Sequence, residues 1–332
     1  MEREARARPF RPHPLLRNGH AQTLAAWAWP GRVRAEENRG DESRLFEVEP
    51  GVRLLARCRW HGDRRARPTV VLVHGLGGSA DAPYVVGAAR LAHAAGASVV
   101  RLNQRNCGGT EALTPTLYHS GMSGDLAAVV GELAREGLSR ILVAGFSMGG
   151  NLALKMAGEM GEDAPPSLLG VCAVSPALDL ARTVANLERP SNYAYERAFA
   201  RGLRDLVLRK KALFPDLYDA RDLARARTVR GFDELYTAPY GGFGDADDYY
   251  ARASAIRSVS RIRVPTLVIH AQDDPLVPFA PLRRPELRDN PWVSLVSPPR
   301  GGHVAFVSAS RSERFWAEHR LALFLRLLAG GA

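Results

Sequence analysis

The chain has 332 residues, of which 46% are hydrophobic, and this length and composition suit one large core, with or without an insertion. Its mean hydropathy is −0.18 and its net charge is +10. No apolar stretch approaches the roughly 20 residues of a membrane span, and residues 1–14 do not resemble a signal peptide, so we expect a cytoplasmic protein. The three cysteines and the scattered histidines lack the spacing of a metal site or a disulfide framework. The arginines are interleaved with acidic residues, and this interleaving argues against nucleic-acid binding.

In chain order, the first predicted element is a hairpin of two strands over residues 43–60, turning at a Pro-Gly pair. Three helical patterns follow. The first covers residues 125–133, with Asp125 as the expected N-cap, the second begins directly after Ser147, and the third covers residues 314–331. Between the helices lie apolar stretches that are continuous rather than alternating, as in a parallel sheet covered on both faces. These predicted strands are residues 68–75, 97–103, 140–147, 168–178, 264–271 and 292–298.

Alternating strands and helices predict an α/β fold with a mostly parallel sheet, in one domain over residues 1–332. The segment 179–254 interrupts this alternation because it is charged, aromatic and mainly helical. We interpret it as a lid inserted between two strands. It could line a pocket for an apolar group, or it could be a surface elaboration only.

The sequence GFSMGGN at residues 145–151 follows a predicted strand and opens a predicted helix. At such a junction a Gly-X-Ser-X-Gly sequence turns sharply and exposes the serine hydroxyl above the sheet. Gly145 and Gly149 would let the strand and the helix approach each other. By itself the pattern also fits a glycine-rich bend, but its place between strand and helix predicts that Ser147 is a catalytic nucleophile.

A nucleophilic serine needs a histidine base and a carboxylate that orients it, and in the α/β-hydrolase order the acid follows the serine and the histidine comes last. His303 lies in a glycine-rich turn after the strand 292–298, and Asp273 and Asp274 follow the strand 264–271. Adjacent side chains cannot both face the histidine. The acid commonly precedes a Val-Pro pair by a few residues, which favours Asp274, with Asp273 turned toward solvent or capping the loop.

The sequence HGLGGS at residues 74–79 follows another predicted strand and is the expected source of an oxyanion hole. We assign one donor to the backbone N–H of Leu76 and the other to that of Met148, after the nucleophile. Each such donor typically stabilises the transition state by about 3–4 kcal/mol. The His74 side chain is expected to anchor the loop.

Together these motifs resemble the α/β-hydrolase superfamily, and five further sequences are similar to its YheT-like family, also called AB-hydrolase family 4. That family includes bacterial predicted esterases, ABHD-type lipid hydrolases and fungal ethyl-ester synthase/esterases. The resemblance runs from about residue 10 to the C-terminus and implies an α/β-hydrolase fold with Ser147, Asp274 and His303 as the triad. The family's Arg-Gly pair is Arg105-Asn106 here. The similar sequences are LLRNGHAQTL (15–24), NQRNCGGT (103–110), LYHSG (117–121), GFDELYTAPYGGF (231–243) and DYYARAS (248–254).

We therefore predict a serine carboxylic-ester hydrolase that forms an acyl-enzyme, and the resemblance suggests short- to medium-chain acyl esters, including lipid esters, as substrates. An acyltransferase with an alcohol acceptor and a non-catalytic binding protein on a hydrolase fold are the alternatives. No cofactor, metal or nucleic acid is expected. The remaining predicted partner is an anionic lipid surface, attracted weakly by the basic N-terminus.

Overall fold

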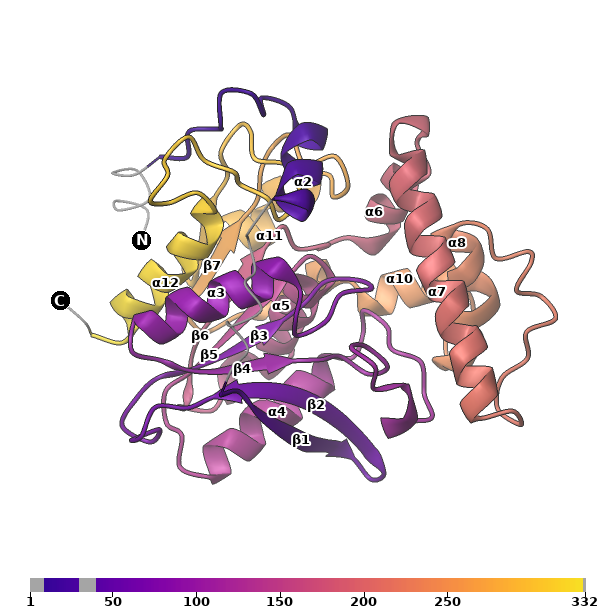
Figure 1. Ribbon diagram of the computed structural model, residues 1–332, viewed down its shortest axis with the longest axis horizontal. Coiled ribbons are helices and arrows are strands. Elements are labelled where there is room, and N and C mark those ends of the chain that lie inside the picture. The colour runs from indigo at the N-terminus through magenta and orange to yellow at the C-terminus, as the bar shows by residue number, and fades with distance from the viewer. Residues whose placement is uncertain (1–8, 30–39, 331–332) are drawn as a thin grey trace.

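The computed structural model describes residues 9–29 and 40–330, in which an eight-stranded sheet has the strand order β1-β2-β4-β3-β5-β6-β7-β8 (Figure 1). Strand β2 is antiparallel to both of its neighbours, and the other pairs from β4 to β8 are parallel. The predicted hairpin and mostly parallel sheet are thus confirmed. The strands are β1 (Glu42–Glu49), β2 (Val52–Arg59), β3 (Thr69–Val73), β4 (Ser98–Leu102), β5 (Ile141–Phe146), β6 (Leu168–Val174), β7 (Thr266–Ile269) and β8 (Val293–Val296).

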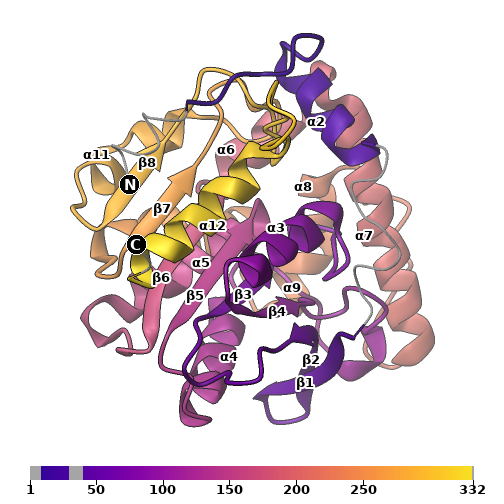
Figure 2. The same ribbon diagram turned by 60° about the vertical axis from the view of Figure 1, so that its left-hand side comes forward.

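Helices cover both faces of the sheet because its central strands carry apolar side chains on both sides (Figures 1 and 2). Val70 and Leu72 of β3 belong to the hydrophobic cluster under α3 (Pro83–Ala94) and α12 (Trp316–Leu328). The intervening side chains of β3 pack on the opposite face, under α4 (Ser123–Arg135) and α5 (Met148–Met160). Strand β8 is only half-buried, because it is the edge of the sheet.

The predicted cap of α4 is wrong. Met122 occupies the N-cap position, and Asp125 lies in the first turn of the helix. Arg105, itself buried, donates from Nε and Nη2 to the two carboxylate oxygens of Asp125, at 2.8 and 2.5 Å. A buried cation needs a paired carboxylate, so the ion pair determines the orientation of Asp125.

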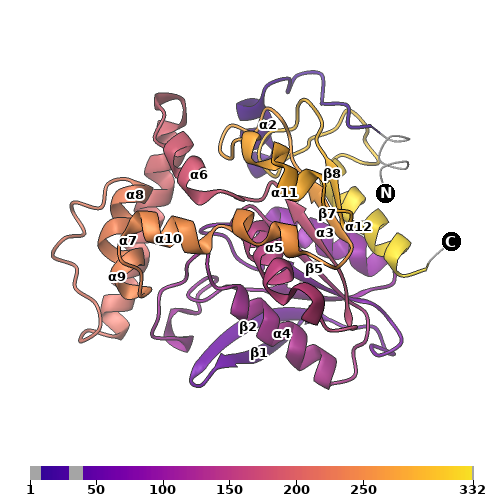
Figure 3. The ribbon, with the colours of Figure 1, turned by 180° about the vertical axis from the view of Figure 1, so that it is seen from behind.

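A helical insertion lies between β6 and β7, on one side of the sheet (Figure 3). Most of its buried apolar side chains belong to one hydrophobic cluster, which also contains residues of the loops around Ser147, and the predicted helical insertion is confirmed. A π-helical turn at Asp233–Thr237 joins two of its helices. Its helices are α6 (Leu180–Leu187), α7 (Tyr193–Leu213), α8 (Val229–Phe232), α9 (Ala238–Tyr240) and α10 (Ala246–Ala253), and α11 (Pro285–Arg288) follows later between β7 and β8.

The helix α2 (Gly19–Ala28) precedes the sheet in the chain and is capped by the Asn18 side chain, which accepts the N–H of Ala21 at 2.7 Å. No helix within residues 9–29 and 40–330 is both long and apolar enough to cross a membrane. Residues 1–8 of the basic N-terminus, to which the weak lipid contact was assigned, lie outside the described residues.

Candidate active site

Ser147 lies at the sharp turn between β5 and α5, with backbone angles φ 54° and ψ −117° that side-chain-bearing residues rarely adopt. Two glycines make the turn sterically feasible. A Cβ atom on Gly145 would lie 2.0 Å from the carbonyl oxygen of Gly149, and one on Gly149 would lie 2.5 Å from that of His74. Strand β5 and helix α5 thus approach each other closely at this turn. Ser147 is half-exposed, its neighbours in the chain are buried, and it lines the cleft described below.

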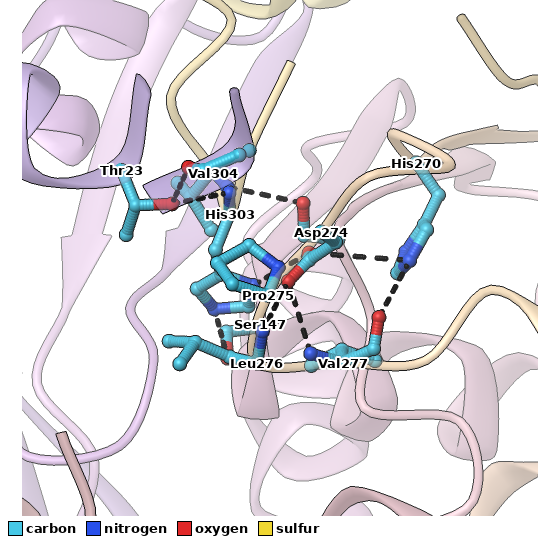
Figure 4. A network of polar contacts seen from close by, with 12 residues as sticks. Thr23, Ser147, His270, Asp274, Pro275, Leu276, Val277, His303 and Val304 are labelled. Atoms are coloured by element: carbon cyan, nitrogen blue, oxygen red, sulfur yellow. Dashed lines mark hydrogen bonds and ion pairs between the residues drawn. The ribbon is translucent and has the colours of Figure 1, made fainter. Parts of the chain in front are cut away.

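The structure brings together Ser147, His303 and Asp274, which lie far apart in the sequence (Figure 4). His303 Nε2 lies 2.9 Å from Ser147 Oγ, and His303 Nδ1 lies 2.8 Å from Asp274 Oδ2. An ionised carboxylate only accepts hydrogen bonds, so Nδ1 carries the proton and Nε2 presents its lone pair to the serine hydroxyl. This tautomer is the one that a general base requires.

Asp273 and Asp274 have different partners, which separates the two sequence candidates. Asp274 is buried, and its second oxygen accepts the N–H groups of Leu276 and Val277, both at 2.9 Å. Asp273 is half-buried and accepts the N–H of Gly302 at 3.0 Å. Asp273 thus holds the loop before His303, and Asp274 contacts the imidazole.

Charge and burial act in opposite directions on Asp274. Burial by itself raises the pKa of this carboxyl, but the imidazoles of His303 and His270 and the N–H of Val277 together outweigh burial, and the pKa lies below its ordinary value. His270, which sequence analysis did not single out, is fully buried with Nε2 3.9 Å from Asp274 and 3.1 Å from the carbonyl oxygen of Val277. Burial lowers the pKa of His270. Asp274 is therefore held in the ionised form that orients His303.

The loop that carries His303 is fastened to α2, a role that sequence analysis missed. Thr23 Oγ1 accepts the N–H of His303 at 2.9 Å and donates to the carbonyl oxygen of Gly19 at 2.7 Å (Figure 4). Gln22 is buried and exchanges hydrogen bonds with both backbone groups of Val307. The only sequence signal for this contact was the similarity of residues 15–24 to the YheT-like family, which does not say what the segment touches.

The loop after β3, which is predicted to supply one oxyanion-hole donor, lies against Ser147. A Cβ atom on Gly75 would lie 3.0 Å from that of Ser147. The N–H of Gly75 donates to the hydroxyl of Tyr84, and that of Gly77 to the hydroxyl of Tyr118, both at 3.0 Å. The N–H groups on either side of Leu76 are therefore hydrogen-bonded. Among the described residues, the N–H of Leu76 itself has no hydrogen-bond acceptor.

His74 anchors this loop from beneath. Its Nε2 accepts the backbone N–H of Gln104 at 3.1 Å, so its Nδ1 carries the proton and donates to the carbonyl oxygen of Gly75 at 2.7 Å. Burial lowers the pKa of His74 to about 4. Met148, whose N–H is the other expected donor, is the first residue of α5, where backbone N–H groups have no intrahelical acceptor.

The Arg105-Asn106 departure from the family pattern is accommodated without loss of the turn. Asn106 has φ 62°, a left-handed conformation that asparagine tolerates better than most residues with a side chain. Its Nδ2 donates to the carbonyl oxygen of Thr116 at 2.8 Å. Asn106 and Cys107 line the cleft, so the substitution keeps the loop beside the site.

A cleft of about 840 Å³ opens onto Ser147 and His303. Its walls come from α2, from the loops after β3 and β4, and from α7 of the insertion, which contributes Tyr195, Phe199 and Leu203. A smaller cavity of about 80 Å³ also reaches Ser147, lined by apolar side chains together with His119 and Asp233. Burial lowers the pKa of His119 to about 4, and its Nδ1 accepts the N–H of Gly121, so this residue is part of the cavity wall.

Within the described ranges, no three histidine, cysteine or acidic side chains are grouped closely enough to hold a metal ion. The cysteines Cys58, Cys107 and Cys172 are buried and free.

Fold and site define the class of this protein. Residues 68–310 match the family model described as the alpha/beta hydrolase fold, and the chain belongs to that family. It is 32% identical over 259 residues to "Putative esterase YheT" of Escherichia coli (strain K12), an alignment that covers 77% of this chain and 75% of that protein. The family resemblance inferred from the motifs is thereby confirmed.

A mammalian relative and a solved structure extend the comparison. The chain is 30% identical over 250 residues to "Phospholipase ABHD3" of Mus musculus, covering 75% of this chain but only 60% of that protein. The crystal structure of the esterase Pf2001 of Pyrococcus furiosus superposes with a TM-score of 0.60 at 20% identity, over 91% of this chain and 97% of that one. That structural likeness concerns the fold.

Proposed function

We propose that this protein is a serine carboxylic-ester hydrolase in which Ser147, His303 and Asp274 form the catalytic triad. The observation that carries the proposal is the hydrogen-bonded chain from Ser147 Oγ through His303 to Asp274, at 2.9 and 2.8 Å, at a cleft that can hold an ester. Relatives named as an esterase and a phospholipase support an acyl-ester substrate, including esters of lipids.

The proposed mechanism follows from the tautomer of His303. Ser147 Oγ attacks the ester carbonyl as its proton passes to His303 Nε2, and Asp274 stabilises the imidazolium. The oxyanion binds the N–H groups of Leu76 and Met148. His303 returns the proton to the leaving alcohol, and water then hydrolyses the acyl-serine with His303 again as the base.

We further propose that the segment 179–254 serves as the lid of the cleft. Its helix α7 supplies aromatic and aliphatic side chains to the cleft wall, among them Phe199 and Leu203. The smaller cavity beside Ser147 is lined largely by the insertion as well. These apolar walls suit a short- or medium-chain acyl group, which would be removed from water on binding.

The decisive experiment combines covalent labelling with turnover. A fluorophosphonate probe should label the protein, and Ser147→Ala should abolish labelling and lower the hydrolysis of p-nitrophenyl acyl esters by on the order of 10⁶-fold. Ser120→Ala is the matched control, because Ser120 lines the same small cavity and is not among the hydrogen-bond partners of His303. An active, labelled Ser147→Ala variant would exclude the proposal. Esters of graded chain length would define the acyl group, and a new ester formed with added alcohol would identify acyl transfer.

A further inference from the structure

Two helices at the mouth of the cleft carry large apolar side chains that are exposed. Leu24 and Trp27 of α2 are 54% and 81% exposed, and Tyr193 at the start of α7 is 63% exposed. The two helices come into contact at His20, whose Nδ1 lies 3.4 Å from the hydroxyl of Tyr195 and whose ring stacks on the Tyr195 ring. We call the exposed surface formed by Leu24, Trp27, Tyr193, Arg197 and Arg201 the α2–α7 rim.

The α2 part of the rim belongs to the entrance of the proposed active site, whereas Tyr193, Arg197 and Arg201 line a separate hollow on α7. Leu24 and Trp27 line the same cleft as Ser147 and His303. Exposed tryptophan and leucine side chains are unfavourable in water. Grouped at a binding entrance, they indicate a surface that another molecule covers when the protein binds its substrate. A protein partner that covered these two residues would also close the cleft to substrate.

The rim is basic as well as apolar. Arg197, Arg201 and Arg204 recur at helical spacing along α7, and together with Arg189 and Arg227 they line a hollow of about 720 Å³ beside the rim. None of these five guanidinium groups forms an ion pair within residues 9–29 and 40–330. The hollow also contains the carboxylates Glu188, Glu196 and Asp205, so arginines outnumber acids there.

We propose that the α2–α7 rim docks on an anionic phospholipid bilayer, with Leu24 and Trp27 at the level of the acyl chains and the arginines of α7 on lipid phosphates. Tryptophan favours the membrane interface, and arginine forms paired hydrogen bonds with phosphate. A bilayer covers the apolar rim and at the same time delivers an ester into the cleft. This inference rests on the proposed function, since it states where that site obtains its substrate.

Binding is measured without turnover, so that it can fail independently of the proposed chemistry. The Ser147→Ala protein is sedimented with vesicles of phosphatidylcholine alone or of equal parts phosphatidylcholine and phosphatidylglycerol. We expect binding to the anionic vesicles, weakened by salt, and a blue shift of tryptophan fluorescence that is absent in a Trp27→Phe variant. Binding of Arg197→Gln/Arg201→Gln should fall by about 30-fold, at about 1 kcal/mol per arginine.

Matched controls separate the rim from general charge and apolar exposure. Arg53→Gln/Arg326→Gln removes two exposed arginines from β2 and α12, and Trp292→Ser removes a tryptophan that is 42% exposed beside β8. Both should bind vesicles as the parent does. The Arg197/Arg201 variant with Ser147 intact should hydrolyse a soluble ester normally but a vesicle-borne ester more slowly.

Three results would overturn the inference. They are equal binding to neutral and anionic vesicles, an unchanged rim variant, and a Trp27 shift that appears with protein concentration in the absence of lipid, which would indicate a second copy of the chain. Vesicle binding by a protein without esterase activity would leave the docking surface standing and remove the proposed function.

Discussion

At the scale of single residues, Asp273 and Asp274 are adjacent in the loop after β7, yet only Asp274 contacts the His303 imidazole. We expect Asp274→Asn to lower kcat by on the order of 10⁴-fold, because the amide no longer stabilises the required tautomer and its cation. Steady-state hydrolysis of a soluble p-nitrophenyl ester measures this loss.

Asp273→Asn is the matched control for that prediction. Its amide oxygen can still accept the N–H of Gly302, so kcat should change little. The reverse ranking of the two variants would assign the triad acid to Asp273.

Thr23 tests whether α2 positions the histidine. Thr23→Val removes the acceptor of the His303 N–H without changing the shape of the side chain, and leaving that N–H unpaired costs about 1–3 kcal/mol. We expect kcat/KM to fall by about tenfold or more, whereas Thr23→Ser, which keeps the hydroxyl, should stay near the parent. Equal loss in both variants would point to packing instead of the hydrogen bond.

The residues of the site differ in how far the sequence predicts them. Ser147 lies in a motif that, between a strand and a helix, predicts a sharp turn with an exposed hydroxyl. His303 is predicted from its position after the serine and the acid along the chain. Thr23 and His270 have no such local pattern, because their roles depend on contacts made across the fold. Asp125 was wrongly predicted as a cap because its partner, Arg105, comes from another loop.

At the scale of elements, the β5–α5 junction depends on the absence of side chains. Gly145→Ala would place a Cβ atom 2.0 Å from backbone, so we expect loss of the folded state or a strongly lowered Tm. Gly131→Ala in α4 is the control, since nothing lies within 4 Å of its added Cβ, and it should stabilise the protein by about 0.5–1 kcal/mol. Thermal unfolding followed by circular dichroism compares them, and equal Tm values would contradict the steric argument.

The π-helical turn contains a buried acid without an ion-pair partner among the described residues. Thr237 and Tyr250 donate to the two oxygens of Asp233 at 2.6 and 2.8 Å, and burial raises the pKa of this carboxyl to about 7. An unfolded aspartate has a pKa of about 3.9, so between these values the folded state holds a proton that the unfolded chain releases. Stability attributable to this group therefore falls as pH rises.

This pH dependence can be isolated by substitution. The free energy of unfolding of the parent should decrease by about 3 kcal/mol between about pH 5 and pH 8 relative to Asp233→Asn, which cannot titrate. Urea denaturation at both pH values gives the difference. Asp216→Asn, at an exposed position, should follow the parent, and parallel behaviour of all three proteins would place the pKa of Asp233 near its ordinary value.

At the scale of the whole molecule, the two faces of the sheet and the insertion belong to three different hydrophobic clusters. The cluster of the insertion also includes Met148 of α5 and Leu276 and Val277 of the loop after β7. Alternating strands and helices in the sequence predict the sheet well. The arrangement of α6 to α10 has no comparable rule, because it depends on which helical faces pack together.

Amide hydrogen exchange should show this division. We expect the buried strands β5 and β6 to exchange only on global unfolding, and the insertion helices to exchange earlier through partial opening. Mass spectrometry of peptic fragments resolves the two regions. Uniform protection would instead mean that the insertion and the sheet unfold as one unit.

The hydrogen bond from His303 to Thr23 joins residues 280 positions apart in the chain. During synthesis α2 leaves the ribosome before the histidine loop, which emerges only after strands β1 to β8 have been translated. Ser147 is therefore translated well before the histidine loop that contacts it in the folded protein. If the proposed triad is the catalytic one, hydrolysis can therefore begin only after the residues that follow β8 have folded against α2.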